Sequence, residues 1–156
     1  MKKFFIVIIL LSLLGGTCNP NYKTELGDGY YLDTYERNYP SICDSNRNIR
    51  ISMSVLDYAY DSVFIIAKQK PYEIIYNRLR QENPNLRYDE KKRLYQESKE
   101  YYYWIINKKQ ENIWHYDTVT QKGYHENVYG PFELEEYLQK RDELGVPDSL
   151  RLTKCN

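Results

Sequence analysis

Two short runs in this chain are apolar on both faces of any strand they could form. The first runs from Val63 to Ala67, and the second, Tyr101 to Ile106, is the most hydrophobic stretch after the N-terminal segment. Isoleucine, tyrosine and tryptophan favour extended structure, and a strand that is apolar on both faces must be covered on both sides. The two runs therefore predict central strands of a sheet.

The rest of the pattern places other strands and helices around that centre. Three more segments carry strand signals: 30–35, 49–54 and 113–119. Three segments are predicted helices: 72 to the Asn83-Pro84 stop, 88–99 and 132–144. Gly145 and Pro147 give the last helix a stop signal, and the segments 37–48 and 120–129 are predicted loops. This order predicts an α+β fold, with a small antiparallel sheet of four to five strands packed by two or three helices.

The N-terminus carries the pattern of an export signal. Lys2 and Lys3 precede an apolar segment from Phe4 to Leu14, which is interrupted only by Ser12. A helix that spans a bilayer needs ~20 apolar residues, so this shorter segment is typical of a signal peptide that is removed after export. The predicted signal peptide covers residues 1–17.

The stretch Leu14-Gly15-Gly16-Thr17-Cys18 resembles the lipobox of bacterial lipoproteins, although the commonest lipobox has Leu at the place of Gly15 and Gly or Ala at that of Thr17. The resemblance implies diacylglyceryl transfer to the Cys18 thiol, cleavage before Cys18 and acylation of the new N-terminus, for example with palmitate. Two or three acyl chains would hold the protein on a membrane, whereas one chain binds marginally. The alternatives are an ordinary secretory signal, which would leave Cys18 as a free or bridged thiol, and an uncleaved anchor.

Composition limits what the exported part can bind. The chain has 22 basic and 22 acidic residues, and removal of Lys2 and Lys3 leaves 20 against 22. No basic field remains to hold nucleic acid, and the interspersed signs argue against a patch for anionic lipids. The 18 tyrosines combine an apolar ring with a polar hydroxyl, so a tyrosine-rich core with hydroxyls at its rim is predicted.

The exported chain has the length of one domain. Residues 18–28 are predicted to form a polar, lipid-anchored tether in front of a single α+β domain at 29–156. If Cys18 is lipidated, only Cys43 and Cys155 remain, and they are candidates for one disulfide outside the cytoplasm. Such a bridge would stabilise the fold by ~4 to 5 kcal/mol as an upper figure. Two unpaired thiols are the alternative.

Local motifs are spread over most of the exported chain: Gly27-Asp28-Gly29-Tyr30-Tyr31, 63–69, 103–108 and 129–147. Together they resemble a domain-of-unknown-function family of short bacterial lipoproteins. The motifs are turns, central strands and a capped helix, so the resemblance implies location and size and brings no activity with it. It implies a membrane-anchored lipoprotein of the bacterial cell envelope, with the outer membrane as the expected site.

The histidines are the first candidates for a metal site. His115 and His125 are the only two in the chain, and Asp117 is predicted on the same strand face as His115. A zinc site needs three or four ligands, so Cys43 or Glu126 would have to join them. Two surface or rim histidines are the alternative, and no metal or other cofactor is predicted.

Other catalytic patterns are equally unspecific. Asp57 and Asp61 could pair as the carboxylates of a glycoside hydrolase, but a chain with 22 acidic residues contains such pairs by chance, and a turn explains Asp61. The glycines Gly27 and Gly29 lack the following helix of a phosphate-binding loop. No catalytic residue is therefore predicted.

Three functional hypotheses remain. The first is a non-enzymatic binding module that contacts an envelope protein or a glycan through an aromatic sheet face. The second is an immunity or inhibitor protein that protects the envelope. The third is an enzyme whose site is assembled from dispersed residues.

Overall fold

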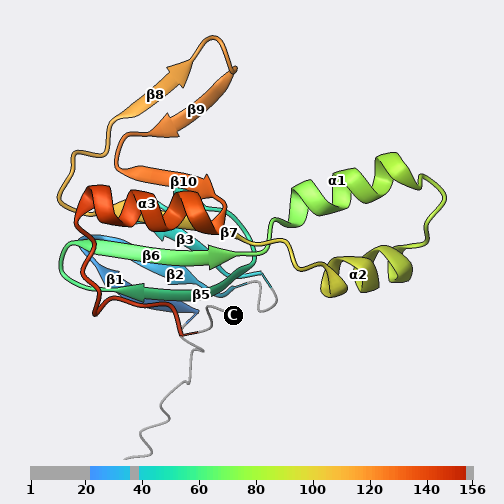
Figure 1. Cartoon of the computed structure of the whole chain (residues 1–156), viewed down its shortest axis with the longest axis horizontal. Coiled ribbons are helices and arrows are strands. Elements are labelled where there is room, and N and C mark those ends of the chain that lie inside the picture. The colour runs from blue at the N-terminus through green and yellow to red at the C-terminus, as the bar shows by residue number, and fades with distance from the viewer. Residues whose placement is uncertain (1–21, 36–38, 154–156) are drawn as a thin grey trace, which may run out of the picture.

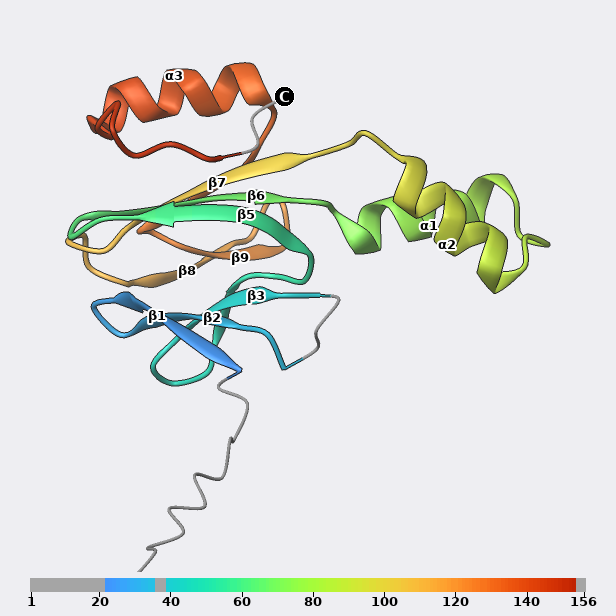
Figure 2. The ribbon, with the colours of Figure 1, turned by 90° about the horizontal axis from the view of Figure 1, so that it is seen from below.

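The computed structural model describes residues 22–35 and 39–153, and two four-stranded antiparallel sheets lie at its centre (Figure 1). The first sheet contains, in spatial order, β1 (Lys23–Gly27), β2 (Tyr30–Asp33), β3 (Ser41–Asp44) and β4 (Ile49–Ile51). The second contains β10 (Val128–Phe132), β7 (Tyr102–Asn107), β6 (Phe64–Gln69) and β5 (Val55–Tyr60). Figure 2 shows the second sheet between the first sheet and helix α3 (Leu134–Leu144).

This layering explains the two-sided apolar strands. All six residues of β6 are buried, and β7 lies between β6 and β10. Ile65 and Ile106 pack in the core between the sheets, whereas Ile66 and Ile105 pack in a second core beneath α3. Because alternate side chains point to opposite faces, each strand supplies both cores. The predicted central strands are confirmed.

Helix α3 and the chain after it cover the outer face of the second sheet. Tyr137 is 1% exposed and stacks on Tyr103, with 5.0 Å between ring centroids. Gly145 has φ 68° and ends the helix in the left-handed conformation, as its sequence signal predicts. The Arg141 guanidinium donates to the carbonyl oxygens of Pro147 at 3.0 Å and Leu150 at 2.9 Å. These bonds attach the C-terminal segment to α3, and Leu150 and Leu152 of that segment pack in the core beneath the helix.

A helical arm interrupts the second sheet between β6 and β7. It consists of α1 (Tyr72–Glu82) and α2 (Tyr88–Glu97), which project from one end of the sheets (Figure 1). At its base, the Tyr95 hydroxyl donates to Ser54 Oγ at 3.0 Å, and Lys70 Nζ donates to the Gln96 carbonyl at 2.8 Å. None of the described helices is long and apolar enough to cross a bilayer.

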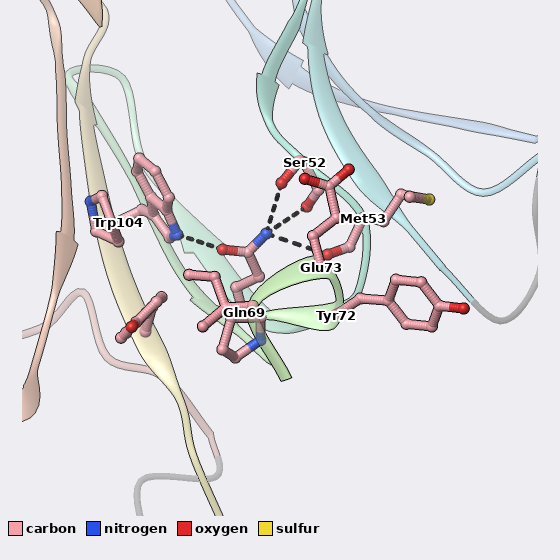
Figure 3. Close-up of a pocket in the computed structure, with 10 residues that line it drawn as sticks. Ser52, Met53, Gln69, Tyr72, Glu73 and Trp104 are labelled. Atoms are coloured by element: carbon pink, nitrogen blue, oxygen red, sulfur yellow. Dashed lines mark hydrogen bonds between the residues drawn. The ribbon is translucent and has the colours of Figure 1, made fainter. Parts of the chain in front are cut away.

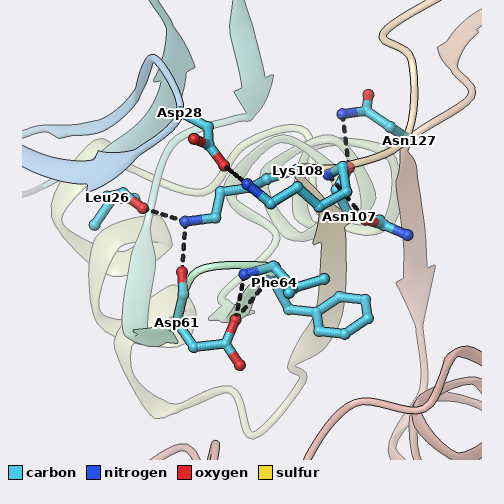
Figure 4. Close-up of polar contacts among 9 residues, drawn as sticks. Leu26, Asp28, Asp61, Phe64, Asn107, Lys108 and Asn127 are labelled. Carbon is cyan, nitrogen blue, oxygen red and sulfur yellow. Dashed lines mark hydrogen bonds and ion pairs between the residues drawn. The ribbon is translucent and has the colours of Figure 1, made fainter.

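A polar clamp closes the other end of the two sheets (Figure 4). Lys108 Nζ donates to the carbonyl oxygens of Leu26 at 2.7 Å and Asp61 at 2.5 Å, so one ammonium joins β1 to the turn before β6. Burial lowers the pKa of this ammonium. Nearby, Asn127 donates from Nδ2 to the Tyr30 hydroxyl at 2.7 Å and to the Asn107 carbonyl at 3.2 Å.

The α+β class and the single domain are confirmed, and five details differ from the sequence expectation. The strands form two sheets and a separate hairpin instead of one sheet. The predicted loop at 37–48 contains β3, and the loop at 120–129 contains β9 (Lys122–His125) and the start of β10. The last helix, predicted from residue 132, begins at Leu134, because Phe132 ends β10. The tether at 18–28 includes β1, so the described fold begins before residue 29.

Candidate functional site

The largest group of exposed aromatic side chains lies on a hairpin outside both sheets. We call it the aromatic hairpin: β8 (Trp114–Asp117) paired antiparallel with β9. None of its eight strand residues is buried, and it extends beyond β10 at the upper edge of Figure 1. Trp114 is 58% exposed, Tyr116 53% and Tyr124 52%. Three neighbouring aromatic side chains that are each more than half exposed mark a candidate interaction surface.

The rings are ordered on the two faces of the aromatic hairpin. Trp114 and Tyr116 share one face, with their centroids 6.0 Å apart and their planes 29° apart. Tyr124 and His115 stack on the opposite face at 5.3 Å. Trp114 lies across Gly123, where a Cβ atom would come within 2.8 Å of the indole. Glycine at this position therefore allows the indole to lie close to the backbone of β9.

A buried ion pair fixes the base of the aromatic hairpin. Arg50 of β4 donates from Nη2 to the Asp44 carboxylate and from Nη1 to His125 Nε2. Asp44 also accepts from the backbone N–H groups of Asn46 and Asn48, both at 2.9 Å. Burial and the Arg50 charge hold the pKa of His125 below its ordinary value of 6.5, against the opposing charge of Asp44. Neutral His125 accepts from Arg50 and so connects β9 to the first sheet.

A second candidate site lies where the helical arm leaves the sheet. It is a pocket of about 110 Å³ with aromatic, proline and methionine walls, and we call it the Trp104 pocket. Its lining residues come from the β4–β5 connection, the end of β6, the start of α1, β7 and β10: Ser52, Met53, Gln69, Pro71, Tyr72, Glu73, Ile74, Tyr102, Trp104 and Pro131. Figure 3 shows Gln69 between the Trp104 indole and the backbone of Ser52 and Met53.

Comparison with known proteins places the chain in a family. Residues 27–156 match the family described as "Protein of unknown function (DUF3997)". The chain belongs to this family. No curated protein and no solved structure matches the chain. The DUF3997 match agrees with the resemblance to a domain of unknown function, and it covers the chain from the last residue of β1 onward.

The candidate metal ligands of this DUF3997 chain do not converge. His115 and His125 occupy adjacent register positions of the aromatic hairpin and so lie on its opposite faces. His115 Nε2 is 3.5 Å from Glu126 Oε2, and Asp117 accepts from the backbone of the turn at Val119 at 2.8 Å. Within the described ranges, no three His, Cys, Asp or Glu side chains are grouped so that they could hold a metal ion.

The candidate carboxylate pair also separates. Asp57 lies in β5 and accepts from the Thr153 hydroxyl at 3.0 Å, whereas Asp61 accepts from the backbone of Val63 and Phe64, both at 2.7 Å. Four residues along a strand span ~13 Å, which exceeds the ~5 to 9.5 Å that separates paired glycosidase carboxylates. Both aspartates have structural partners in this DUF3997 fold.

The structure describes one of the three cysteines that were predicted to be lipidated or bridged. Cys18 and Cys155 lie outside the described residues. Cys43 lies in β3, is 4% exposed and has a free thiol that is 3.7 Å from Ser41 Oγ. Burial raises the pKa of this thiol. Lipidation of Cys18 and a bridge between Cys43 and Cys155 therefore stay predictions, and a count of free thiols in unfolded, unreduced protein would test the bridge.

Sequence reasoning placed Trp114, Tyr116 and His115 on a strand but did not recognise the aromatic hairpin. Its partner strand, β9, has the sequence Lys-Gly-Tyr-His and shows no apolar alternation. The one available signal was Trp114 and Tyr116 at strand spacing beside polar residues. The Trp104 pocket joins residues from five segments, so no local pattern in the DUF3997 sequence could have indicated it.

Proposed function

We propose that the protein is a membrane-anchored lipoprotein of the bacterial cell envelope that binds an envelope glycan through the aromatic hairpin, without catalysing a reaction. The anchor would be acyl chains on Cys18, which the lipobox-like sequence before it supports. Two or more chains are enough for stable attachment. The outer membrane is the expected location.

The position of the aromatic hairpin suits an anchored binding protein. The described chain begins just before β1, which Figure 1 places at the lower edge of the molecule, and the aromatic hairpin lies at the opposite edge. Only four residues lie between Cys18 and the start of β1 at Lys23, so the chain between them reaches at most ~18 Å. An anchor at Cys18 would therefore hold β1 near the membrane and direct the aromatic hairpin away from it.

The exposed pair of rings, Trp114 and Tyr116, is the observation that carries the proposal. A sugar ring has a face of C–H groups that packs on an aromatic ring, while its hydroxyls reach sideways to polar groups. The neighbouring residues Asp117 and Lys122 point to the opposite face of the aromatic hairpin, so the two rings themselves provide the binding face. The 6.0 Å between the ring centroids would let neighbouring sugars of one strand each contact a ring.

The dimensions of the surface favour a glycan over a flat protein partner. A stable protein interface buries ~800 Å² on each side around an apolar centre. The aromatic hairpin is two strands of four residues whose rings are divided between two faces. Such a narrow ribbon fits a thin, extended ligand.

Co-sedimentation with isolated, insoluble bacterial cell-wall glycan tests the proposal. The protein without residues 1–17 should sediment with the glycan, and Trp114→Ala combined with Tyr116→Ala should abolish this. Tyr35→Ala is the control, since Tyr35 is 75% exposed and follows β2, outside the aromatic hairpin. Retention of the double variant, or capture of an envelope protein in place of glycan, would contradict the proposal.

Attachment is tested separately in bacteria that are fed a fatty-acid probe. The full chain should incorporate the probe and fractionate with membranes. Cys18→Ser should lose both properties, because the thiol that would accept the diacylglyceryl group is absent. Equal labelling of the two proteins, or a mature N-terminus beyond Cys18, would show that the anchor is not at this residue.

A further inference from the structure

The Trp104 pocket has a rigid aromatic wall. The Trp104 indole donates from Nε1 to Gln69 Oε1 at 2.8 Å. Gln69 is 4% exposed and donates from Nε2 to the Ser52 carbonyl at 2.8 Å, the Ser52 hydroxyl at 2.9 Å and the Met53 carbonyl at 3.1 Å. This network fixes the position of the indole and engages its only donor. A ligand can therefore meet the ring face of Trp104 but not its N–H group.

The backbone of β10 completes this wall. Gly130 has φ 129°, and a Cβ atom there would come within 2.8 Å of both the Trp104 indole and the Tyr103 carbonyl oxygen. Any larger residue would displace the ring. The next residue, Pro131, lines the pocket itself. The wall is thus held from two sides before any ligand arrives, which is the condition for a preorganised site.

The electrostatic character of the lining favours positive charge. Glu73 is the only charged residue that lines the pocket, it is exposed, and it forms no hydrogen bond or ion pair with any described residue. The ring faces of Trp104 and Tyr102 carry the negative pole of the aromatic quadrupole, whereas the Tyr72 ring stacks on Tyr76. A cavity of about 110 Å³ brings any ligand close to these walls. Aromatic faces together with a carboxylate are the surroundings that organic cations prefer.

Lys68 and Lys70 are near the pocket residues in sequence, but neither places its own positive charge in the pocket. Lys70 Nζ is bonded to the Gln96 carbonyl and lies 5.0 Å from the Tyr95 ring centroid. Lys68 Nζ lies 4.2 Å from the Tyr101 ring centroid. Neither lines the pocket.

The first turn of α1 is the one feature that would favour an anion. Its N-cap residue is Pro71, and the helix has no side-chain cap. Glu73 lies in this same turn, where a carboxylate offsets the positive end of the helix dipole. An anion would meet this carboxylate and find no basic side chain in the lining. The charges around the pocket therefore favour a bound cation over a bound anion.

We propose that the Trp104 pocket binds an alkylated ammonium group, with its methyl or methylene groups against Trp104 and Tyr102 and its charge near Glu73. The volume is somewhat smaller than the ~150 Å³ of an engineered cavity that accepts benzene, which suits one such group. The group could belong to a small molecule or lipid headgroup, or it could be the end of a lysine side chain. This inference uses no residue of the aromatic hairpin.

The test uses Trp114→Phe protein, in which Trp104 is the only tryptophan and its fluorescence reports on the pocket alone. Choline is the first probe, and 3,3-dimethyl-1-butanol, which has the same shape without the charge, is its matched control. Choline should change the emission saturably and bind roughly tenfold more tightly than the neutral alcohol. The second probe is lysine amide acetylated on its α-nitrogen, which keeps the side-chain ammonium charged. Tighter binding of this probe than of choline indicates a lysine side chain as the ligand, and tighter binding of choline indicates a small molecule or a lipid headgroup.

Two further variants complete the test. Glu73→Gln should weaken choline binding roughly two- to fivefold and leave the neutral alcohol unaffected. Glu82→Gln, an exposed carboxylate at the far end of α1, should change neither. Equal affinity for choline and its neutral analogue, a choline affinity that ignores Glu73→Gln, or no response of Trp104 to choline or the lysine probe would each overturn the inference. None of these results would bear on glycan binding, because the glycan experiment depends on Trp114 and Tyr116.

Discussion

Ile105 supports the fold from the centre of β7. Its side chain is fully buried beneath α3, so replacement by alanine leaves a cavity in a core that cannot collapse around it. Ile105→Ala should lower the free energy of unfolding by ~2 to 5 kcal/mol, a large part of the stability of a domain. Ile74→Ala is the control: this side chain is 48% exposed and should cost less than ~0.5 kcal/mol. Urea denaturation measures both, and equal costs would contradict the described core.

His125 should make stability depend on pH. Its pKa is lowered in the folded protein by burial and by Arg50, so the unfolded chain takes up a proton near pH 6.5 while the folded chain does not. The unfolded state then binds more protons, and the free energy of unfolding should fall as the pH drops from 7.5 to 5.5. The carboxyl of Asp44, whose pKa is lowered from 3.8, titrates below this window.

The variant His125→Gln should remove most of this pH dependence, because a glutamine oxygen can still accept from Arg50 but does not titrate. His115→Gln is the matched control on the exposed face of the aromatic hairpin and should preserve it. Urea denaturation at the two pH values gives the comparison. A pH dependence that survives in His125→Gln would show that other groups cause it.

At the scale of elements, β7 and the aromatic hairpin should differ most in hydrogen exchange. The amides of Tyr103 to Ile106 lie in a strand paired on both sides, so their exchange should approach the limit set by global unfolding. The aromatic hairpin has two strands and no buried residue, so it should open locally and exchange much faster. Equal protection of the two elements would mean that the aromatic hairpin is packed in a way that these contacts do not show.

Gly123 is predicted to matter for binding more than for stability. An added methyl group would displace the Trp114 indole, but the aromatic hairpin contributes nothing to the buried cores. Gly123→Ala should therefore shift the Trp114 emission and weaken glycan binding, while the free energy of unfolding changes by less than ~1 kcal/mol. A large loss of stability with unchanged binding would reverse this assignment.

The elements with the clearest sequence signal are those that bury a regular apolar pattern, although the largely exposed helix α2 and strand β8 were also predicted. The strands β6 and β7 and the helices α1 and α3 carry such patterns, and each packs on a core or a helix partner. Strand β3 was missed because it follows a polar loop and has only four residues. It forms because β2 and β4 pair with it on both sides. Pairing of this kind depends on partners that are distant in sequence.

The candidate sites were less accessible to sequence reasoning for the same physical cause. No residue of the aromatic hairpin strands is buried, so β9 lacks the alternation of apolar and polar residues that marks a half-buried strand. The Trp104 pocket depends on Gln69, whose polar side chain in a buried strand gave no hint that it would position an indole. Conversely, the prediction that depends on a contiguous motif, lipidation of Cys18, concerns residues outside those the structure describes.

At the scale of the whole molecule, the parts have separate tasks. The two sheets and α3 form the rigid body. Lys108 joins the two sheets at one end, and Tyr95 attaches the helical arm at the other. The aromatic hairpin and the helical arm project from this body (Figure 1). The proposed anchor precedes β1, which lies at the edge opposite the aromatic hairpin. This arrangement lets the binding surface be altered without disturbing the core, which is why the predicted effects on binding and stability separate.

The fluorescence of Trp114 during titration with soluble glycan fragments tests the central claim most directly. In Trp104→Phe protein, Trp114 is the only tryptophan and is 58% exposed, so a sugar that covers it removes water from the indole. We expect a saturable blue shift with cell-wall fragments of two or more sugars, and none when Tyr116→Ala is added. An emission spectrum that stays unchanged at saturating glycan, with circular dichroism showing a folded protein, would contradict glycan binding by the aromatic hairpin.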